Sequence, residues 1–471
     1  MPAQLTTRAQ VNGYRFLLKR IQHALVRRDV RMLHDPMRAQ FRSMVVGAVL
    51  ATLALAGCAI LGLLKPQGAV RDAKIIVGKD SGALFVVQEG VLHPALNLAS
   101  ARLITESAEK PTSVKESKLS SLPRGPMLGI PGAPSTLLGP AVKGDRSVWN
   151  LCDSTTPLDG VSRLAVAGDP KMSDTIRALS SDEALLVSAG GKTYLLYDGK
   201  RAEIDLGNDA IVRSMQLHDI EPRPIGAGLL NAAVPVPALA PPAIPEVGAP
   251  GKVPGTKVGA VLKVAGVTAT ELYVVVPTGI QRVSPFAAEV IRNADSLGMS
   301  DIAAVPPDTL RGVPVVSTLP MDKFPATRPN IIASDTFPVT CASWAKLDAH
   351  HDATLTLLAG RDWPLPAAAK PAMSVGSGLD ADRIDAAYIQ PSTGEFVRVT
   401  GIEQGSVRLD SLYYIADTGI RYGIPDMATA EILGLGDKPK PAPWQIIGQL
   451  VPGPTVARPQ ALMAYDSVPG P

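Results

Sequence analysis

The sequence is poor in aromatic residues and in cysteine. Phe, Trp and Tyr together make up 4% of its 471 residues, so the stacked aromatic platform of a single-strand nucleic-acid binder is not expected. Three cysteines are too few for a disulfide-dense miniature domain or a cysteine-rich zinc module.

Hydrophobic residues, glycine and proline are abundant instead. Hydrophobic side chains make up 46% of the chain, which excludes a disordered protein, and the length suffices for two or more packed units. The 42 glycines and 43 prolines predict short elements joined by many turns, because both residues punctuate regular structure.

The basic residues concentrate at the N-terminus, in front of a long uncharged stretch. Before Ser43 the chain carries nine arginines and lysines but only two acidic residues. The stretch from Ser43 to Leu64 contains no charge, and Arg42 and Lys65 bracket it. About 20 apolar residues cross the hydrocarbon core of a bilayer. The sequence therefore predicts one transmembrane helix over residues 44–64.

The charge asymmetry predicts the orientation of this helix. Flanks rich in lysine and arginine stay cytoplasmic, so residues 1–43 are expected inside the cell and everything after the 65–73 linker in the periplasm. A competing interpretation is the lipobox-like Leu55-Ala56-Gly57-Cys58, which would leave a lipidated Cys58. The basic arm before it is longer than a secretory signal, which usually totals about 15–30 residues. A cell-membrane anchor is therefore the favoured interpretation.

One face of the N-terminal arm is apolar. Its apolar residues recur at three- and four-residue steps, which predicts an amphipathic helix ringed by arginine and lysine. They are Val11, Tyr14, Leu18, Ile21 and Leu25. Two interpretations stay open: a helix on the membrane surface held by lipid headgroups, and a docking helix for a cytoplasmic partner.

Four segments beyond the membrane helix share one order of signals: a hydrophobic strand, a glycine turn, a second strand and a helix start. The turn glycines are Gly90, Gly199, Gly279 and Gly419. Asp198-Gly199 is the strongest two-residue hairpin signal of the chain, and Ser284-Pro285 suits a helix cap and first turn. The irregular intervals exclude a regular solenoid. They indicate insertions between the first and second segments and between the third and fourth.

The two insertions contain the cysteines of the outer region. Cys152 lies three residues after Trp149, and Cys341 three residues before Trp344, a setting typical of a bridge buried against an indole. Because a lone thiol pair outside the membrane is expected to oxidise, we predict a Cys152–Cys341 disulfide. Two unpaired buried cysteines are the alternative. The bridge would join both insertions into one core, with the second and third segments looped out between its halves.

The predicted fold is a single-pass membrane protein whose α+β outer domain has four repeat units around a discontinuous, disulfide-linked, β-rich core. The expected limits are 74–140 for the first repeat, 141–190 for the first part of the core, 191–256 for the second repeat with a proline-rich linker, 257–330 for the third repeat, 331–400 for the second part of the core, and 401–471 for the fourth repeat and the tail. Residues 385–390 and 395–399 are expected to form a hairpin of the core. The linker from Val234 to Pro254 is expected to be exposed and semi-stiff.

Three short patterns resemble parts of chemical sites. Gly190-Gly191-Lys192-Thr193 matches the end of a phosphate-binding loop, but Leu186 stands where that motif needs its first glycine, and a strand follows instead of a helix. His350-His351-Asp352 suggests a metal, yet adjacent residues point to different sides and no third ligand is recognisable. Asp80-Ser81-Gly82 resembles a serine-hydrolase fragment without its partners. Turns explain all three, so no catalytic residue, cofactor or metal is expected.

The N-terminal arm carries a long and specific pattern. It consists of Gln10-Val11-Asn12-Gly13-Tyr14-Arg15-Phe16-Leu17-Leu18-Lys19-Arg20, then Ala24-Leu25-Val26-Arg27-Arg28-Asp29-Val30-Arg31-Met32, then Asp35-Pro36. These runs closely resemble the EccB family, membrane components of the mycobacterial type VII (ESX) secretion system, and the resemblance extends over essentially the whole chain.

The resemblance implies a periplasmic domain with four repeats around a disulfide-linked core. It also implies assembly with the EccC motor ATPase, EccD, EccE and further EccB copies into an inner-membrane complex that supports protein export across the mycobacterial envelope. A structural subunit is therefore the predicted function. One alternative is a peptidoglycan-binding wall anchor, because the repeats are similar to such modules. The other is a nucleotide hydrolase, because some members carry an ATPase label. No nucleic-acid partner is implied.

Overall fold

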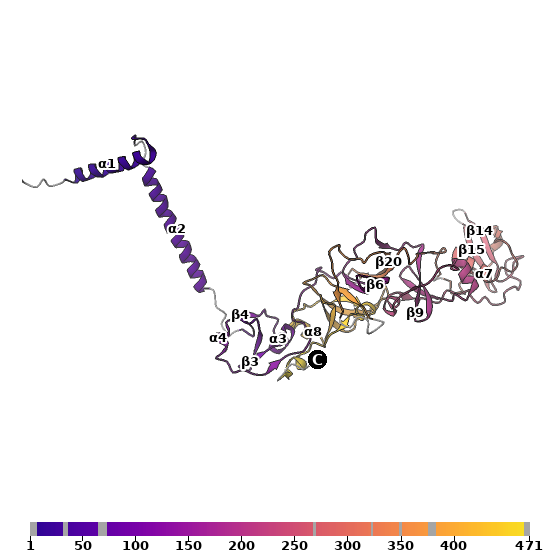
Figure 1. Cartoon of the computed structure of the whole chain (residues 1–471). Helices are drawn as coiled ribbons and strands as arrows, with labels where there is room; N and C mark the ends of the chain where they lie inside the picture. Colours follow the sequence, from indigo (N-terminus) through magenta and orange to yellow (C-terminus); the bar gives the residue numbers. More distant parts are fainter. Residues whose placement is uncertain are drawn as a thin grey trace, which may run out of the picture. The chain divides into compact units, whose positions relative to one another are not determined.

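The computed structural model describes residues 7–31, 36–64, 73–266, 270–321, 324–347, 351–374 and 383–465. The chain divides into two compact units, Met1–Arg71 and Asp72–Pro471. Each unit is described by itself below (Figure 1).

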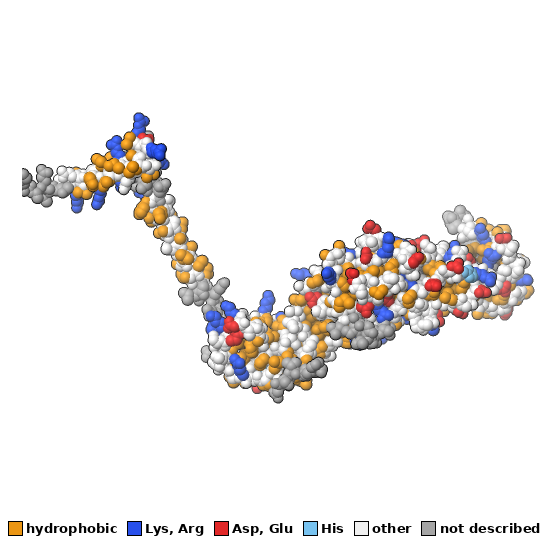
Figure 2. Space-filling view, viewed as in Figure 1, with side chains coloured by type: hydrophobic (Ala, Val, Ile, Leu, Met, Phe, Trp, Pro, Cys, Tyr) orange, Lys and Arg blue, Asp and Glu red, His pale blue; other side chains and the backbone are white. Residues whose placement is uncertain are grey.

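The N-terminal unit consists of two helices. Helix α1 (Arg8–Arg27) begins at a capping box in which Thr7 and Gln10 bond reciprocally, and it ends where Arg28 turns left-handed. Helix α2 (Pro36–Leu64) contains Phe41–Leu61, which is long and apolar enough to cross a membrane. Figure 2 shows hydrophobic side chains along α2 and arginines and lysines around α1. The predicted membrane-spanning helix is present, and Cys58 lies inside it.

The centre of the second unit, Asp72–Pro471, is a seven-stranded sheet of strand order β21-β22-β7-β6-β19-β20-β8. Its strands come from two stretches of chain: β6 (Ser147–Leu158), β7 (Val161–Ala167) and β8 (Ile176–Ala178), then β19 (Val339–Lys346), β20 (Thr354–Gly360), β21 (Ala372–Met373) and β22 (Ala386–Tyr388). Strand β6 pairs antiparallel with β19 over its whole buried half. The central sheet therefore exists only because segments far apart in sequence meet.

Among the described residues, four smaller sheets each contain a three-stranded antiparallel meander, and a fifth has only two strands. The meanders are β1 (Ile75–Gly78), β2 (Leu84–Gln88) and β3 (Val91–Pro94) in the first small sheet; β9 (Glu183–Ala189), β10 (Lys192–Tyr197) and β11 (Lys200–Ile204) in the second; β14 (Val261–Ala265), β15 (Thr270–Val276) and β16 (Gly279–Val283) in the third; and β23 (Gly394–Thr400), β24 (Leu412–Ala416) and β25 (Ile420–Ile424) in the fourth.

A helix follows each meander, and each helix has a side chain as its N-cap. These helices are α3 (Leu98–Thr105), α5 (Asp209–Met215), α7 (Pro285–Ala294) and α8 (Met427–Ile432), capped by Asn97, Asn208, Ser284 and Asp426. Each cap oxygen accepts an N–H of the first turn, which satisfies a donor that the helix leaves free. The cap at Ser284 and the proline after it are as predicted.

A parallel strand then returns to the first strand of each meander. These strands are β4 (Thr112–Val114), β12 (Arg223–Pro224), β17 (Ala303–Val305) and β26 (Lys440–Pro443). Short helices come next: α4 (Glu116–Leu119), α6 (Ala227–Asn231), the 3-10 turn Pro307–Leu310, and α9 (Trp444–Ile447). Strands β13 (Val234–Pro235) and β27 (Val451–Pro452) line the far edges of the second and fourth sheets, and β18 (Asn330–Ile331) adds to β9.

The end of the described chain returns to the first small sheet. Helix α10 (Arg458–Ala461) packs on α3, and β28 (Ala464–Tyr465) pairs with β5 (Met127–Leu128). Side chains of the first and fourth small sheets share one hydrophobic core, in which Ile75 and Tyr414 are 1% exposed. These two sheets therefore pack together although they come from opposite ends of the unit Asp72–Pro471.

One sequence expectation is wrong, and another holds only in part. The hairpin of residues 385–390 with 395–399 does not form, because β22 pairs with β7 and β21 whereas β23 pairs with β24 and β26. Strand β23 is almost continuously buried, so its pattern could not show which sheet it joins. The linker from Val234 is also not simply exposed, because Leu239 and Val253 are 2% and 0% exposed.

Candidate functional site at the disulfide-linked junction

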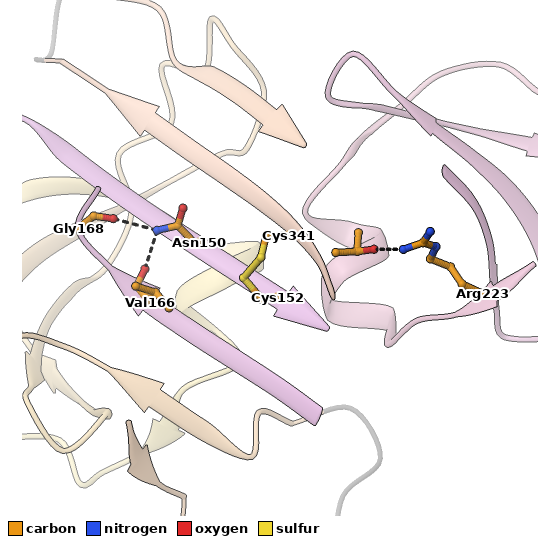
Figure 3. Close-up of a disulfide and its surroundings, with 7 residues drawn as sticks. Asn150, Cys152, Val166, Gly168, Arg223 and Cys341 are labelled. Atoms are coloured by element: carbon orange, nitrogen blue, oxygen red, sulfur yellow. Dashed lines mark hydrogen bonds between the residues drawn. A yellow bond between two sulfur atoms is a disulfide. The ribbon is translucent and has the colours of Figure 1, made fainter. Parts of the chain in front are cut away.

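Cys152 and Cys341 are joined by a disulfide between neighbouring strands (Figure 3). They are direct cross-strand partners on β6 and β19, and both are fully buried. On the same face, Asn150 donates its amide to the carbonyls of Val166 and Gly168, at 3.2 and 2.9 Å. The predicted disulfide is thus present, and it ties together the two chain segments that build the central sheet.

The tryptophans near the cysteines lie on the other face of the sheet. Trp149 and Trp344 are also cross-strand partners, but a spacing of three residues in a strand reverses the side. Both pack in the main hydrophobic core, whereas the disulfide packs with a separate cluster that includes the half-buried Trp363. The expectation of a bridge against Trp149 or Trp344 is therefore wrong.

A buried arginine fastens the second small sheet to the central sheet. Arg223, on β12, is 2% exposed. Its guanidinium donates to the carbonyls of Ile332 (2.6 Å) and Phe337 (2.8 Å) and to the hydroxyl of Thr340 (2.8 Å), and Figure 3 shows it pointing at β19. Burial lowers the Arg223 pKa to about 10, so the side chain remains charged at neutral pH. Three acceptors thus compensate a desolvated charge.

A buried carboxylate lies beside this contact. Asp153 is the cross-strand partner of Thr340 and is 6% exposed. It accepts the N–H of Gly226 at 2.6 Å, just before α6. Burial raises the Asp153 pKa to about 6; the Gly226 hydrogen bond and Arg163 oppose this rise, and Asp385 adds to it. Asp153 and Arg223 therefore hold the segment that leads into α6 against the central sheet.

We expect Asp153→Asn to stabilise the protein at neutral pH. Because the folded-state pKa of about 6 exceeds the ordinary value of 3.8, the folded protein binds a proton more tightly than the unfolded chain does. Stability from this group is full below the ordinary value and is lost as the pH rises through 6. A shift of this size corresponds to roughly 3 kcal/mol at most.

The measurement is a urea midpoint of the full chain at several pH values. Asp153→Asn should raise the midpoint at pH 7.5 and flatten its change between pH 4.5 and 7. Asp159→Asn, in the exposed turn after β6, is the matched control and should leave both unchanged. A lower midpoint for Asp153→Asn at pH 7.5 would show that the ionised form stabilises the junction.

The phosphate-loop fragment is a hairpin turn in the structure. Gly190 and Gly191 have φ values of 57° and 76°, and Lys192 pairs with Ala189 across the turn. The Lys192 ammonium donates to Glu203 at 2.9 Å on the exposed surface. No helix begins there, since residues 192–197 form β10. The backbone therefore does not form the phosphate cradle of a P-loop.

The Asp80-Ser81-Gly82 pattern also lacks a catalytic arrangement. The Ser81 hydroxyl and N–H donate to Glu116 at 2.7 and 2.8 Å, so this serine stabilises a loop. His350 lies outside the described residues. Within the described ranges, no three His, Cys, Asp or Glu side chains gather closely enough to hold a metal ion.

Sequence reasoning missed Asp153 and Arg223 entirely. Both are charged residues next to apolar positions, a signal that does not distinguish a buried group from an exposed one. A second pair was missed in the same way: Lys440 and Glu395 form a nearly buried ion pair at 3.1 Å, and Lys440 also donates to the carbonyl of Val142.

Together the two units define a class: a membrane-anchored protein with one candidate spanning helix among the described residues and an α+β second unit built around a disulfide-linked central sheet. The family model for the type VII secretion system ESX-1 transport TM domain B, EccB, matches residues 3–470. The chain therefore belongs to the EccB family.

Relatives match along nearly the whole chain. The ESX-3 secretion system ATPase EccB3 of Mycolicibacterium smegmatis is 37% identical over 98% of this chain and 91% of its own length. The ESX-1 secretion system ATPase EccB1 of Mycobacterium tuberculosis is 36% identical over 100% and 97%. These names contain the word ATPase, whereas the one phosphate-loop fragment of this chain is a hairpin turn.

Solved structures match as well. A chain of an intact ESX-5 inner membrane complex has a TM-score of 0.76 at 30% identity, with coverage of 100% of this chain and 98% of that chain. An EccB3 dimer from the ESX-3 core complex has a TM-score of 0.73 at 34% identity, covering 83% and 100%.

Proposed function

We propose that this chain is a structural subunit of a type VII secretion inner-membrane complex. The observation that carries the proposal is the match to the EccB family model over residues 3–470, together with the match of the whole chain to a chain of an intact ESX-5 inner membrane complex. In this role α2 anchors the protein in the inner membrane, and the second unit, Asp72–Pro471, takes part in a periplasmic assembly. EccC, EccD, EccE and further copies of the chain are the proposed partners.

The proposed orientation places α1 in the cytoplasm, because its flank is rich in arginine and lysine. The apolar stripe of α1 is exposed along the helix: Tyr14 is 67%, Ile21 49% and Leu25 76% exposed. A partner protein or the membrane surface would cover such a stripe.

The test is affinity purification of the tagged full chain from native membranes. We expect the EccC, EccD and EccE subunits to travel with it. Leu18→Asp with Ile21→Asp should reduce their recovery if α1 docks on a protein, whereas Arg20→Gln on the polar side is the matched control. Recovery of the unmodified chain without any of these subunits would overturn the proposal.

We also propose that the four small sheets are repeats of one unit. After each short helix, a segment runs parallel to the third strand of the meander, at Arg124, Pro235, Val315 and Pro452. Four residues further on, each segment buries an aliphatic side chain: Leu128, Leu239, Leu319 and Val456 are 6%, 2%, 7% and 0% exposed. An equal register at four places supports a common ancestor unit.

This proposal revises the domain limits. Strand β9 belongs with the second small sheet and β23 with the fourth, by their pairing. We therefore divide the second unit into repeats at about 74–140, 180–240, 245–330 and 392–465. The central sheet is formed by residues 147–178 and 339–388.

Nucleotide hydrolysis is tested by one substitution. Lys192→Ala should change neither ATP hydrolysis nor the unfolding midpoint measurably, because Lys192 makes only an exposed ion pair with Glu203. The assay uses the full chain in lipid nanodiscs, with Lys200→Ala as the control on the same sheet. ATP hydrolysis that Lys192→Ala alone abolishes would restore the hydrolase interpretation.

A further inference from the structure

An open groove lies where the second and fourth small sheets meet. Helices α6 and α9 pack together there, and Gly228 of α6 lies so close to Gln449 that a Cβ would be 2.9 Å from its amide carbon. The polar lining of the groove consists of Arg201, Asn231, Glu403, Gln445 and Gln449, with the Trp444 indole beside them. Neither the disulfide-linked junction nor the proposed assembly role uses these residues.

Trp444 is a fixed and accessible aromatic surface. It is 42% exposed, whereas Trp149 and Trp344 are 2% and 1% exposed. The Arg421 guanidinium lies 4.9 Å from the indole ring centre, and the Tyr413 ring lies 5.9 Å away. A cation and a second ring therefore hold the indole in place. An exposed tryptophan fixed in this way is prearranged for a ligand.

The polar side chains around Trp444 offer both donors and acceptors. Arg201 donates to the Asn231 carbonyl oxygen at 2.6 Å, which leaves the Asn231 NH₂ group facing the groove as a donor. Glu403 presents an exposed carboxylate, and Gln449 also lines the groove. One cation and one anion cancel, so the lining has no net charge.

We propose that this groove binds a neutral saccharide, with one sugar ring against the Trp444 indole. The apolar C–H face of a sugar fits a flat aromatic surface, and vicinal hydroxyls both donate and accept, as the carboxamide, guanidinium and carboxylate groups require. The missing net charge disfavours phosphate-bearing and strongly ionic ligands. The proposal goes beyond the assembly role and does not depend on it.

An extended peptide fits the same groove less well. Strand β13 is the edge strand there, and Pro235 on it and Pro237 just after it lack the N–H groups that adding a strand requires. Apart from Trp444, the apolar lining consists of Pro235 and Ile402, which form no deep pocket for a side-chain anchor.

The test titrates the full chain in lipid nanodiscs with chitotetraose, cellotetraose and maltotetraose. Nanodiscs replace maltoside detergent, whose sugar headgroup would compete for the groove. Tryptophan fluorescence and saturation-transfer NMR report binding, which we expect at a Kd of roughly 1 mM or tighter for at least one probe. Trp444→Ala and, independently, the exposed Glu403→Ala should each weaken that binding at least tenfold. Trp363→Phe, on the disulfide face, is the matched control and should leave it unchanged.

Saturable binding that both groove variants lose, with unchanged melting curves, supports the proposal. Binding of none of the three probes overturns it, and so does binding that survives both groove substitutions. Binding of a proline-rich peptide at Trp444 without any saccharide binding also overturns it. Co-purification of the secretion subunits with Trp444→Ala is measured in parallel, so a failed assembly role is distinguished from a failed ligand site.

Discussion

Cys152→Ser is expected to lower the free energy of unfolding of the second unit, Asp72–Pro471, by about 5 kcal/mol in the chain-entropy model of cross-links. The reason is the length of the closed loop: 189 residues separate Cys152 from Cys341, and the unfolded chain gains the conformations that the bridge denies it. The two strands remain direct neighbours in the folded state, so the effect arises mainly in the unfolded ensemble.

The measurement is the urea midpoint of the full chain in nanodiscs. The buried Trp149 and Trp344 report unfolding of the central sheet through their fluorescence. Cys341→Ser should give the same loss, and the double variant should lose no more than either single variant. Cys58→Ser is the matched control, because Cys58 is the free cysteine and lies in α2. Equal midpoints with and without the bridge would contradict the prediction.

Arg223→Ala is expected to cost about 3 kcal/mol or more, because each buried acceptor that loses its donor costs about 1–3 kcal/mol. The substitution leaves the carbonyls of Ile332 and Phe337 without the donor that now satisfies them. It also removes the link between β12 and the start of β19. The expected loss is therefore large although Arg223 touches no proposed ligand or partner.

Arg213→Ala is the matched control, because this arginine of α5 has an exposed side chain and an exposed ion pair with Asp209. This substitution should change the free energy of unfolding by less than about 0.5 kcal/mol. If Arg223→Ala unfolds at the same urea concentration as the parent, the guanidinium contributes no net stability. The second small sheet is then held by apolar packing alone.

Local patterns were sufficient for several elements. The uncharged run before Leu64 predicted α2 because hydrocarbon tolerates no charge, and Asp198-Gly199 predicted a hairpin because few other pairs accept that turn. The Cys152–Cys341 pair followed from counting thiols outside the membrane. Each of these three inferences depends on neighbours in sequence or on a residue count, and none of them requires knowledge of the packing.

The sequence pattern was not sufficient to assign one strand to its sheet. The sequence analysis placed residues 395–399 in the central core. In the structure they belong to β23, which pairs with β24 in the fourth small sheet, and β24 begins 12 residues after β23 ends. An almost fully buried strand has no polar face to mark its side, so only the neighbouring strands decide its sheet.

The sequence by itself determined the membrane helix, the amphipathic arm, the helix cap at Ser284 and the thiol pair, because hydropathy, turn geometry and capping act within a few residues. Only the tertiary structure decided which face of the central sheet carries the disulfide, that Asp153 and Arg223 are buried, and that Arg201, Glu403 and Trp444 line one groove. Burial and proximity depend on how strands far apart in the sequence pack together. The sequence alone does not show whether a charged residue is exposed to water or buried inside the protein.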